Sequence, residues 1–365
     1  MFDSLYTSGI RLTSVGICFL LLSSVGVAQD EVIAGGDQIE IRKGTTGTTW
    51  LKGEIVDFNG DELQFRTSVD RNVQYYATSD ILQTRYQQSV EHQQGVALLA
   101  KKNYAEAEQR LETALKVEPR EWVRREILAL QIRVALALFD YEKAGNRFIA
   151  LCKSDEKTRH FHLIPLNWRL PEEISDQTEN LIIKGAVSET TARRWLQEKE
   201  PVAQLLGVSW LLFRSEDQEE LQRTLLLLNR SLNDRVQNAS QMQVWRTYIA
   251  EGRFTEAELN RWETRIEDLD DLDRSGPYYL LAVAYNRKLE FDHAAVRWLW
   301  LKANESPDHL LSSEAQLNAA EALVRLGLTE QSLIVYRELV EAYPESPSGK
   351  MARDRIRPPE TSSSK

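Results

Sequence analysis

The sequence predicts a mainly α-helical protein, in which an α-solenoid of stacked helical hairpins follows a small all-β domain. Short segments rich in β-branched and aromatic residues fill residues 37–85, and helical periodicity then continues to about residue 357. A spacing of small and large residues also recurs at intervals of 37 to 38 positions within the helical part. Together these observations predict a β domain at the N-terminal side of a helical array.

The first 28 residues have the pattern of a secretory signal peptide. Arg11 precedes an apolar run that ends near Val27, and the small residues Gly26 and Ala28 suit a signal peptidase. An uncleaved membrane anchor is the alternative, but the run is shorter than the roughly 20 apolar residues that span a bilayer. We expect cleavage after Ala28, no membrane span in the mature chain, and secretion into the periplasm or cell envelope of a bacterium.

Composition and cysteine count narrow the classes of partner. The formal net charge of −10 lacks the basic surface expected of a protein that binds nucleic acid. Only one of the two cysteines, Cys152, follows the predicted cleavage site, so we expect a mature chain without an internal disulfide. Packing alone must then stabilise the fold. The sequence does not predict an oligomeric state.

Residues 37–85 are predicted to form four or five short strands. The strand-like segments are DQIEIRK, TTWLKGEIVDF, DELQFRTS and NVQYYATSDILQTRY. Asn59-Gly60-Asp61 between two of them suits a tight hairpin. This rhythm resembles an SH3-like or Sm-like small β-barrel, closed so that no strand edge is exposed. The resemblance implies a module that docks a peptide or RNA. Secretion and acidity argue against RNA, and we favour a structural cap or spacer.

A stretch that ends at Pro119, HQQGVALLAKKNYAEAEQRLETALKVEP, shows the repeated spacing most clearly. Small and large residues alternate on two consecutive helices: Gly95, Leu98, Tyr104, Ala107, Leu111 and Ala114. Two helices approach closely only where a small residue admits the neighbouring backbone, and a large side chain fills the gap one turn later. A proline then ends the second helix.

The same spacing returns later in the chain. Its positions are Tyr141, Ala144, Phe148 and Leu151; Phe254 and Ala257; Phe291, Ala294, Trp298 and Leu301; and Thr329, Ser332, Tyr336, Leu339 and Pro344. The pattern resembles tetratricopeptide repeats in residues 87–152 and 245–355. Between residues 153 and 244 the signature is lost. There we expect degenerate helical pairs after an irregular crossing at residues 163–175, and a disordered tail at residues 356–365.

Residues with the chemistry of catalysis or metal binding form no convincing group. His160 and His162 are close in sequence, but no further ligands stand at a suitable spacing. The acidic run from Glu267 to Asp273 lacks the glycine and the terminal glutamate of a calcium-binding loop, and is interpreted as a solvated connection. A phosphate-binding loop and a nucleophile elbow are also missing from the sequence. We expect no cofactor, no metal and no enzymatic activity.

The resemblance to tetratricopeptide repeats implies a concave groove that receives a peptide. Carried over to the last two clear repeats, its groove-facing positions are Tyr279, Asn286, Arg287, Glu321 and Arg325. Asn286, Arg287 and Arg325 could together clamp a carboxylate, because guanidinium groups bind carboxylates through two parallel hydrogen bonds. Solvated surface charges are the alternative interpretation.

The predicted function is therefore a non-enzymatic scaffold that binds a protein or peptide partner along the concave face. Two alternatives remain open. In the first, the protein is an envelope-assembly component whose β domain is a second docking module. In the second, it is an enzyme that acts on a cell-wall polymer.

Overall fold

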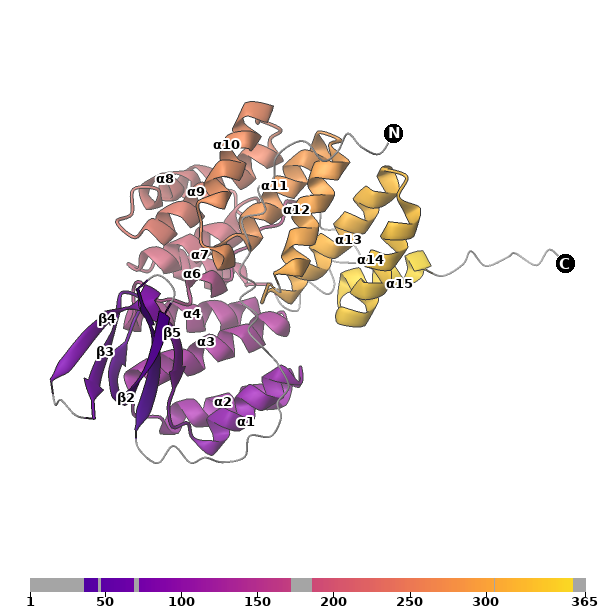
Figure 1. Cartoon of the computed structure of the whole chain (residues 1–365). Coiled ribbons are helices and arrows are strands. Elements are labelled where there is room, and N and C mark those ends of the chain that lie inside the picture. Colours follow the sequence, from indigo (N-terminus) through magenta and orange to yellow (C-terminus); the bar gives the residue numbers. More distant parts are fainter. Residues whose placement is uncertain (1–35, 45–46, 69–71, 172–185, 305, 357–365) are drawn as a thin grey trace.

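The computed structural model describes residues 36–44, 47–68, 72–171, 186–304 and 306–356. The predicted signal peptide and residues 357–365 of the predicted tail lie outside these ranges. The protein is mainly α-helical, with a small antiparallel sheet at the N-terminal side (Figure 1). Among the described residues, no helix has both the length and the apolar character needed to cross a membrane.

The sheet has five antiparallel strands and is open, so the prediction of a closed barrel is wrong. The strands are β1 (Asp37–Lys43), β2 (Gly47–Phe58), β3 (Glu62–Thr67), β4 (Val73–Ala77) and β5 (Ile81–Arg85), in the order β4-β3-β2-β1-β5. The short 3-10 helix η1 (Thr78–Asp80) connects the two edge strands. The helix α3 (Glu121–Ala137) covers the apolar face of the sheet. The buried residues of the sheet and of this helix belong to one hydrophobic core.

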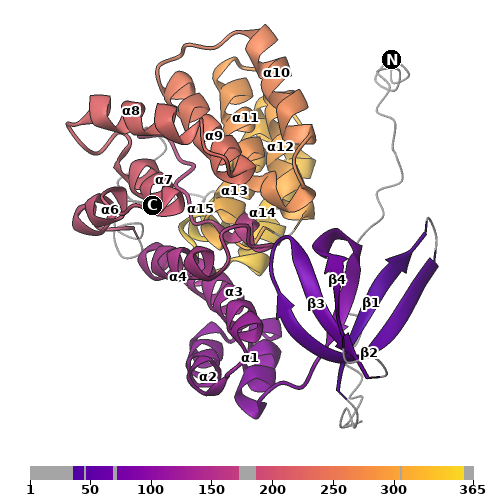
Figure 2. The same cartoon turned by 90° about the vertical axis from the view of Figure 1, so that its left-hand side faces the viewer.

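Two side chains of α3 attach the sheet to this helix through polar contacts. The indole Nε1 of Trp122 donates to the carbonyl oxygen of Ile55 at 3.2 Å. The buried guanidinium of Arg125 donates to the carbonyl oxygen of Phe58 at 3.0 Å and pairs with the carboxylate of Asp57. The pairing of β2 with β3 shifts register between Ile55 and Asp57, and such a bulge bends the strand. The sheet therefore packs against the helices as one body, beside α1 and α3 in Figure 2.

Fourteen α-helices form the rest of the described chain. They are α1 (Val90–Ala100), α2 (Tyr104–Val117), α3, α4 (Tyr141–Ser154), α6 (Glu189–Leu196), α7 (Pro201–Leu211), α8 (Gln218–Leu228), α9 (Asp234–Ala250), α10 (Glu256–Glu267), α11 (Ser275–Arg287), α12 (Phe291–Ala303), α13 (His309–Arg325), α14 (Thr329–Ala342) and α15 (Pro347–Ile356). Short 3-10 helices lie at η2 (Phe161–Leu163) and η4 (Asp271–Asp273). Most consecutive helices pack against each other, which gives a repeat-like architecture.

The same turn ends the first helix of five hairpins. Its central residue has a positive φ of 58° to 78° and is Lys102, Phe139, Gly252, Leu289 or Gly327. In each turn this residue donates its N–H to the carbonyl three positions back, and the next N–H reaches the carbonyl five positions back. A further positive φ, at Phe213, follows α7 in the region where the sequence signature is lost. The hydrogen bonds there differ from those of the repeated turn, because the N–H groups of Arg214 and Ser215 both donate to the carbonyl of Leu211.

The helical array curves back on its own beginning. The helices α7, α9, α11 and α13 contact one another in that order, and α13 also contacts α3. The hydroxyl of Tyr141 donates to Asp308 Oδ1 at 2.7 Å, and the rings of Tyr104 and His309 meet edge to face at 5.5 Å. Helices from the two ends of the array therefore lie side by side.

Candidate functional site: the inner face of the helical array and its cavity

The inner segment, residues 161–170, lies against the four helices α7, α9, α11 and α13. On α7, Trp210 Nε1 donates to the carbonyl of Pro165 at 2.9 Å, and Ser209 Oγ accepts from the N–H of Asn167 at 2.9 Å. On α9, Arg246 Nε donates to the carbonyl of Arg169 at 2.7 Å. Pro165 lacks a backbone N–H and disfavours an α-helix in this segment, and side chains of the array satisfy several of the segment's backbone groups.

Contacts with α11 and α13 also hold the inner segment in place. The indole of Trp168 packs so closely on Gly276 of α11 that a Cβ there would lie 2.0 Å from its Cε2 atom. The buried guanidinium of Arg169 pairs with Glu314 of α13 at 3.4 Å. The inner segment thus contacts all four helices.

Four of the predicted groove residues lie near the C-terminal ends of α11 and α13, and the fifth lies in the core. Tyr279 is buried. Arg287 donates to the carbonyls of Ile249 and Ala250, at 2.5 and 3.3 Å, and so caps the C-terminal end of α9. The half-buried Asn286 neighbours it at the end of α11.

The two predicted residues on α13 have different surroundings. Glu321 pairs with Arg355 of α15 at 3.3 Å, whereas Arg325 is exposed in the last turn of α13. The structure therefore places four of the five residues near helix ends and one in the core. The carboxylate clamp stays a prediction.

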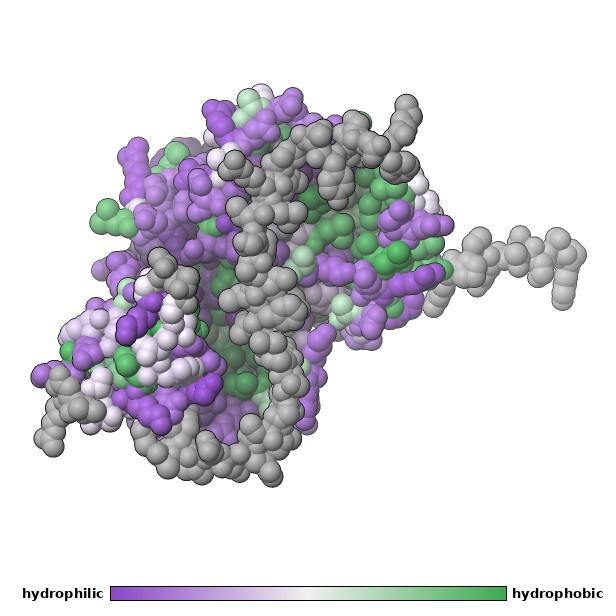
Figure 3. Space-filling model, viewed as in Figure 1, coloured by the Kyte–Doolittle hydropathy of each residue, from purple (hydrophilic) through white to green (hydrophobic). Residues whose placement is uncertain are grey.

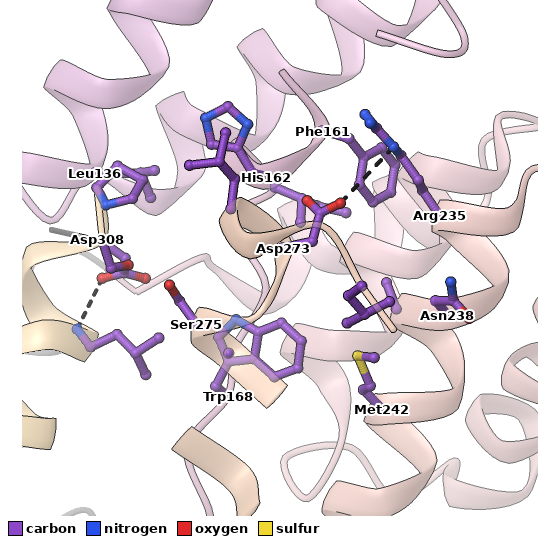
Figure 4. Close-up of a pocket in the computed structure, with 18 residues that line it drawn as sticks. Leu136, Phe161, His162, Trp168, Arg235, Asn238, Met242, Asp273, Ser275 and Asp308 are labelled. Atoms are coloured by element: carbon purple, nitrogen blue, oxygen red, sulfur yellow. Dashed lines mark hydrogen bonds and ion pairs between the residues drawn. The ribbon is translucent and has the colours of Figure 1, made fainter. Parts of the chain in front are cut away.

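A cavity of about 70 Å³ lies between the inner segment, α9, η4, the start of α11 and the loop before α13 (Figure 4). Its wall is mainly apolar: Leu136, Phe161, Ile164, Trp168, Ala239, Met242, Leu269, Leu272, Pro307 and Leu311. Its polar groups are His162, Arg235, Asn238, Asp273, Ser275, Ser306 and Asp308. A mostly apolar hollow with a few convergent polar groups is the usual form of a small binding site.

Asp273 is the most perturbed acid of this cavity. Burial raises the pKa of its carboxyl to about 6, and the carboxylate of Asp270 adds to the shift. The guanidinium of Arg235 opposes the shift, but its Nε atom is 4.0 Å from the Asp273 carboxylate. Strongly shifted acids in a cavity are candidates for function, because burying a charge without close compensation is costly.

The other titratable groups of the cavity have clear partners. Burial, together with the charge of Arg133, lowers the pKa of His162 to about 3, so this ring is neutral at ordinary pH. Burial also raises the pKa of Asp308, although its carboxylate accepts hydrogen bonds from Tyr141 and from the Leu311 N–H. Within the described part of the chain, no three His, Cys, Asp or Glu side chains are grouped to hold a metal ion.

The sequence interpretation missed this cavity. The sequence pattern places Asp273 in a solvated acidic connection and indicates no role for His162 beyond an unsupported metal pair. The available signal was the apolar residues inside the acidic run, Leu269 and Leu272, which both line the cavity. Leucines between aspartates indicate that one side of the loop faces apolar surroundings.

Comparisons with known proteins assign this chain to no family. No protein-family model matches it, and a search of curated protein sequences finds no match. No relative therefore supplies residue roles for the inner segment or for the cavity.

Proposed function

We propose that this protein is a non-enzymatic scaffold of tetratricopeptide-like repeats that binds a protein partner in the bacterial cell envelope. The repeated turn at the ends of the first helices carries this proposal, because it recurs at intervals of 37 or 38 residues around residues 102, 139, 252, 289 and 327, with one longer interval between residues 139 and 252. Stacked repeats of this length form an α-solenoid whose extended surface suits protein recognition. The predicted signal peptide supports the location.

The proposed contact surface is the edge of the array where these turns lie, because the inner segment fills the inner face. Exposed apolar side chains collect at the turns of this edge: Leu138, Leu289, Val324, Leu326 and Leu328. Arg325 adds a charge beside the last three. Figure 3 shows apolar surface on the part of the molecule formed by α13 and α14. Apolar groups rimmed by charge are typical of protein interfaces.

Affinity capture with cross-linking from an envelope fraction tests this surface. The double variant Leu326→Asp/Leu328→Asp places charges on the edge and should lose the partner that the wild-type protein retains. Leu328 is the N-cap residue of α14, a position that accepts aspartate readily, so the fold should be kept. The matched control is Leu226→Asp/Leu227→Asp on α8, where both leucines are also exposed. Equal capture by both double variants would contradict the proposal.

The open sheet favours one alternative, an envelope-assembly component with a second docking module. Each edge strand, β4 and β5, pairs with a neighbouring strand on one side only, and Tyr75 on β4 is 62% exposed. An unpaired edge can accept a strand from a partner. In the same capture experiment, loss of one partner in Tyr75→Lys with retention of another would favour assembly.

A further inference from the structure

We propose that the cavity beside Asp273 binds an alkylammonium group, supplied either by a small free amine or by a lysine side chain. Two carboxylates, Asp273 and Asp308, border the same hollow and come from different loops. Figure 4 shows Asp273, Ser275 and Trp168 around this space, with His162 and Asp308 on its other sides. These two acids outnumber Arg235, the one arginine among the described residues that line the cavity, so the lining favours a cation over an anion.

The cavity opens to solvent beside Asp273. Its side chain keeps 19% of its surface exposed, and the neighbouring Leu272 is 61% exposed. A cation from solvent therefore meets the carboxylate at the entrance, where partial burial strengthens the attraction relative to open water. Ser275 adds a hydroxyl oxygen that can accept a hydrogen bond from an ammonium group.

The one arginine of the cavity does not make it a site for anions. Arg235 donates to the carbonyl of Thr158 at 2.7 Å, pairs with Asp270 at 3.5 Å and reaches the carboxylate of Asp273 at 4.0 Å, so its guanidinium is already engaged by other groups of the chain. His162 is neutral, because burial lowers its pKa to about 3. An anion would therefore meet two carboxylates and little positive charge to offset them.

The apolar wall fits the hydrocarbon part of the ligand. Phe161, Trp168 and Met242 line the cavity together with several leucines. The ring's quadrupole attracts an ammonium group beside an aromatic face, and burial of methylene groups against an apolar wall adds to binding. The cavity volume of about 70 Å³ limits the occupant to a short chain rather than a folded segment.

Binding should depend on pH through Asp273, whose pKa burial raises to about 6. The groups around it are Arg235 on α9, Asp270 before η4, His162 in the inner segment and Asp308 before α13. Behind these lie Arg133, which faces His162, and Tyr141 and Arg169, which act on Asp308. His162 stays neutral between pH 5 and 8, because burial lowers its pKa to about 3, whereas the pKa of Asp273, about 6, falls inside that window.

Isothermal titration calorimetry of the full chain with n-butylammonium chloride tests the proposal. We expect saturable binding at about pH 7.5 and roughly tenfold weaker binding at about pH 5, because the carboxyl is then about nine-tenths protonated. Asp273→Asn should weaken binding at least tenfold. Asp271→Asn, in the same η4 turn but with an exposed carboxylate paired to Arg274, should bind like the wild type.

Neutral and blocked ligands complete the design. n-Butanol has the same chain without the charge and should show no saturable binding. Nα-acetyl-lysine methylamide distinguishes the two sources: binding of this probe assigns the site to a lysine side chain, and its exclusion assigns the site to a free amine. Circular dichroism checks that Asp273→Asn is folded, and the pH series on the wild type stands without that variant. No saturable binding at about 10 mM amine, or equal binding by the butanol, would overturn the proposal.

Discussion

Three of the five repeated turns place a side chain where glycine is the favoured residue. Lys102, Phe139 and Leu289 have positive φ values, while Gly252 and Gly327 occupy the same position in the other two turns. This backbone region costs an L-residue roughly 1–2 kcal/mol. The chain tolerates the cost because the surrounding turn makes both hydrogen bonds of its motif.

Leu289→Gly should therefore stabilise the protein, by about 1 kcal/mol. Leu289 is 72% exposed, so removing its side chain loses little buried surface. The measurement is the urea midpoint of unfolding, with Val296→Gly as the control. Val296 is similarly exposed but lies inside α12, where glycine should destabilise by about 0.5 kcal/mol. Destabilisation by both variants would show that the Leu289 turn carries no relievable strain.

At this scale the sequence shows which residue types are present but not which of them are buried. Five acids stand between Glu267 and Asp273, and nothing in their spacing distinguishes Asp273 from the exposed Asp271. The difference arises where the start of α11 meets α9 and the inner segment, which are contacts between distant parts of the chain. The burial and the partners of the five predicted groove residues likewise depend on tertiary contacts.

At the scale of elements, the fit between Trp168 and Gly276 connects the inner segment to α11. Gly276→Ala would place a Cβ about 2.0 Å from the indole, so the tryptophan or the helix must move. We expect a loss of about 1–3 kcal/mol in the free energy of unfolding, with a shift in tryptophan fluorescence. Ser275→Ala is the adjacent control and should change stability little.

A double-mutant cycle with Trp168→Leu separates this contact from other effects of the alanine. If the indole causes the loss, Gly276→Ala should cost much less in the Trp168→Leu background. Additive losses in the two backgrounds would place the cause elsewhere in α11.

The mainly helical character and the N-terminal strands could be predicted from the sequence, because both depend on local periodicity. The closure of the sheet could not. Whether five strands close or stay open depends on what covers their apolar face, and here α3 does so through Trp122 and Arg125, more than 60 residues away. The prolines at 165 and 171 predicted an irregular segment at residues 163–175, and residues 164–170 are irregular, while residues 172–175 lie outside the described ranges. The place of this segment on the inner face depends on packing that only the assembled helices provide.

At the scale of the whole molecule, the contact between Tyr141 and Asp308 joins α4 to the start of α13. Tyr141→Phe removes this hydrogen bond to a carboxylate and should lower the free energy of unfolding by about 1–3 kcal/mol. Hydrogen exchange should quicken in α3, α4 and α13 together, because these helices hold one another. Faster exchange in α4 alone would show that the two ends of the array open independently. Tyr104→Phe is the control, since its ring contact with His309 needs no hydroxyl.

The same contact has a consequence for the order in which the chain can fold. A ribosome releases Tyr141 long before Asp308, which lies 167 positions later, and the inner segment precedes all four helices that seat it. The hairpin of α3 and α4 therefore keeps part of its apolar surface uncovered until α13 has been synthesised. Contacts of such long sequence separation slow folding and prolong exposure to aggregation. The start of α13 therefore completes the core that surrounds α4.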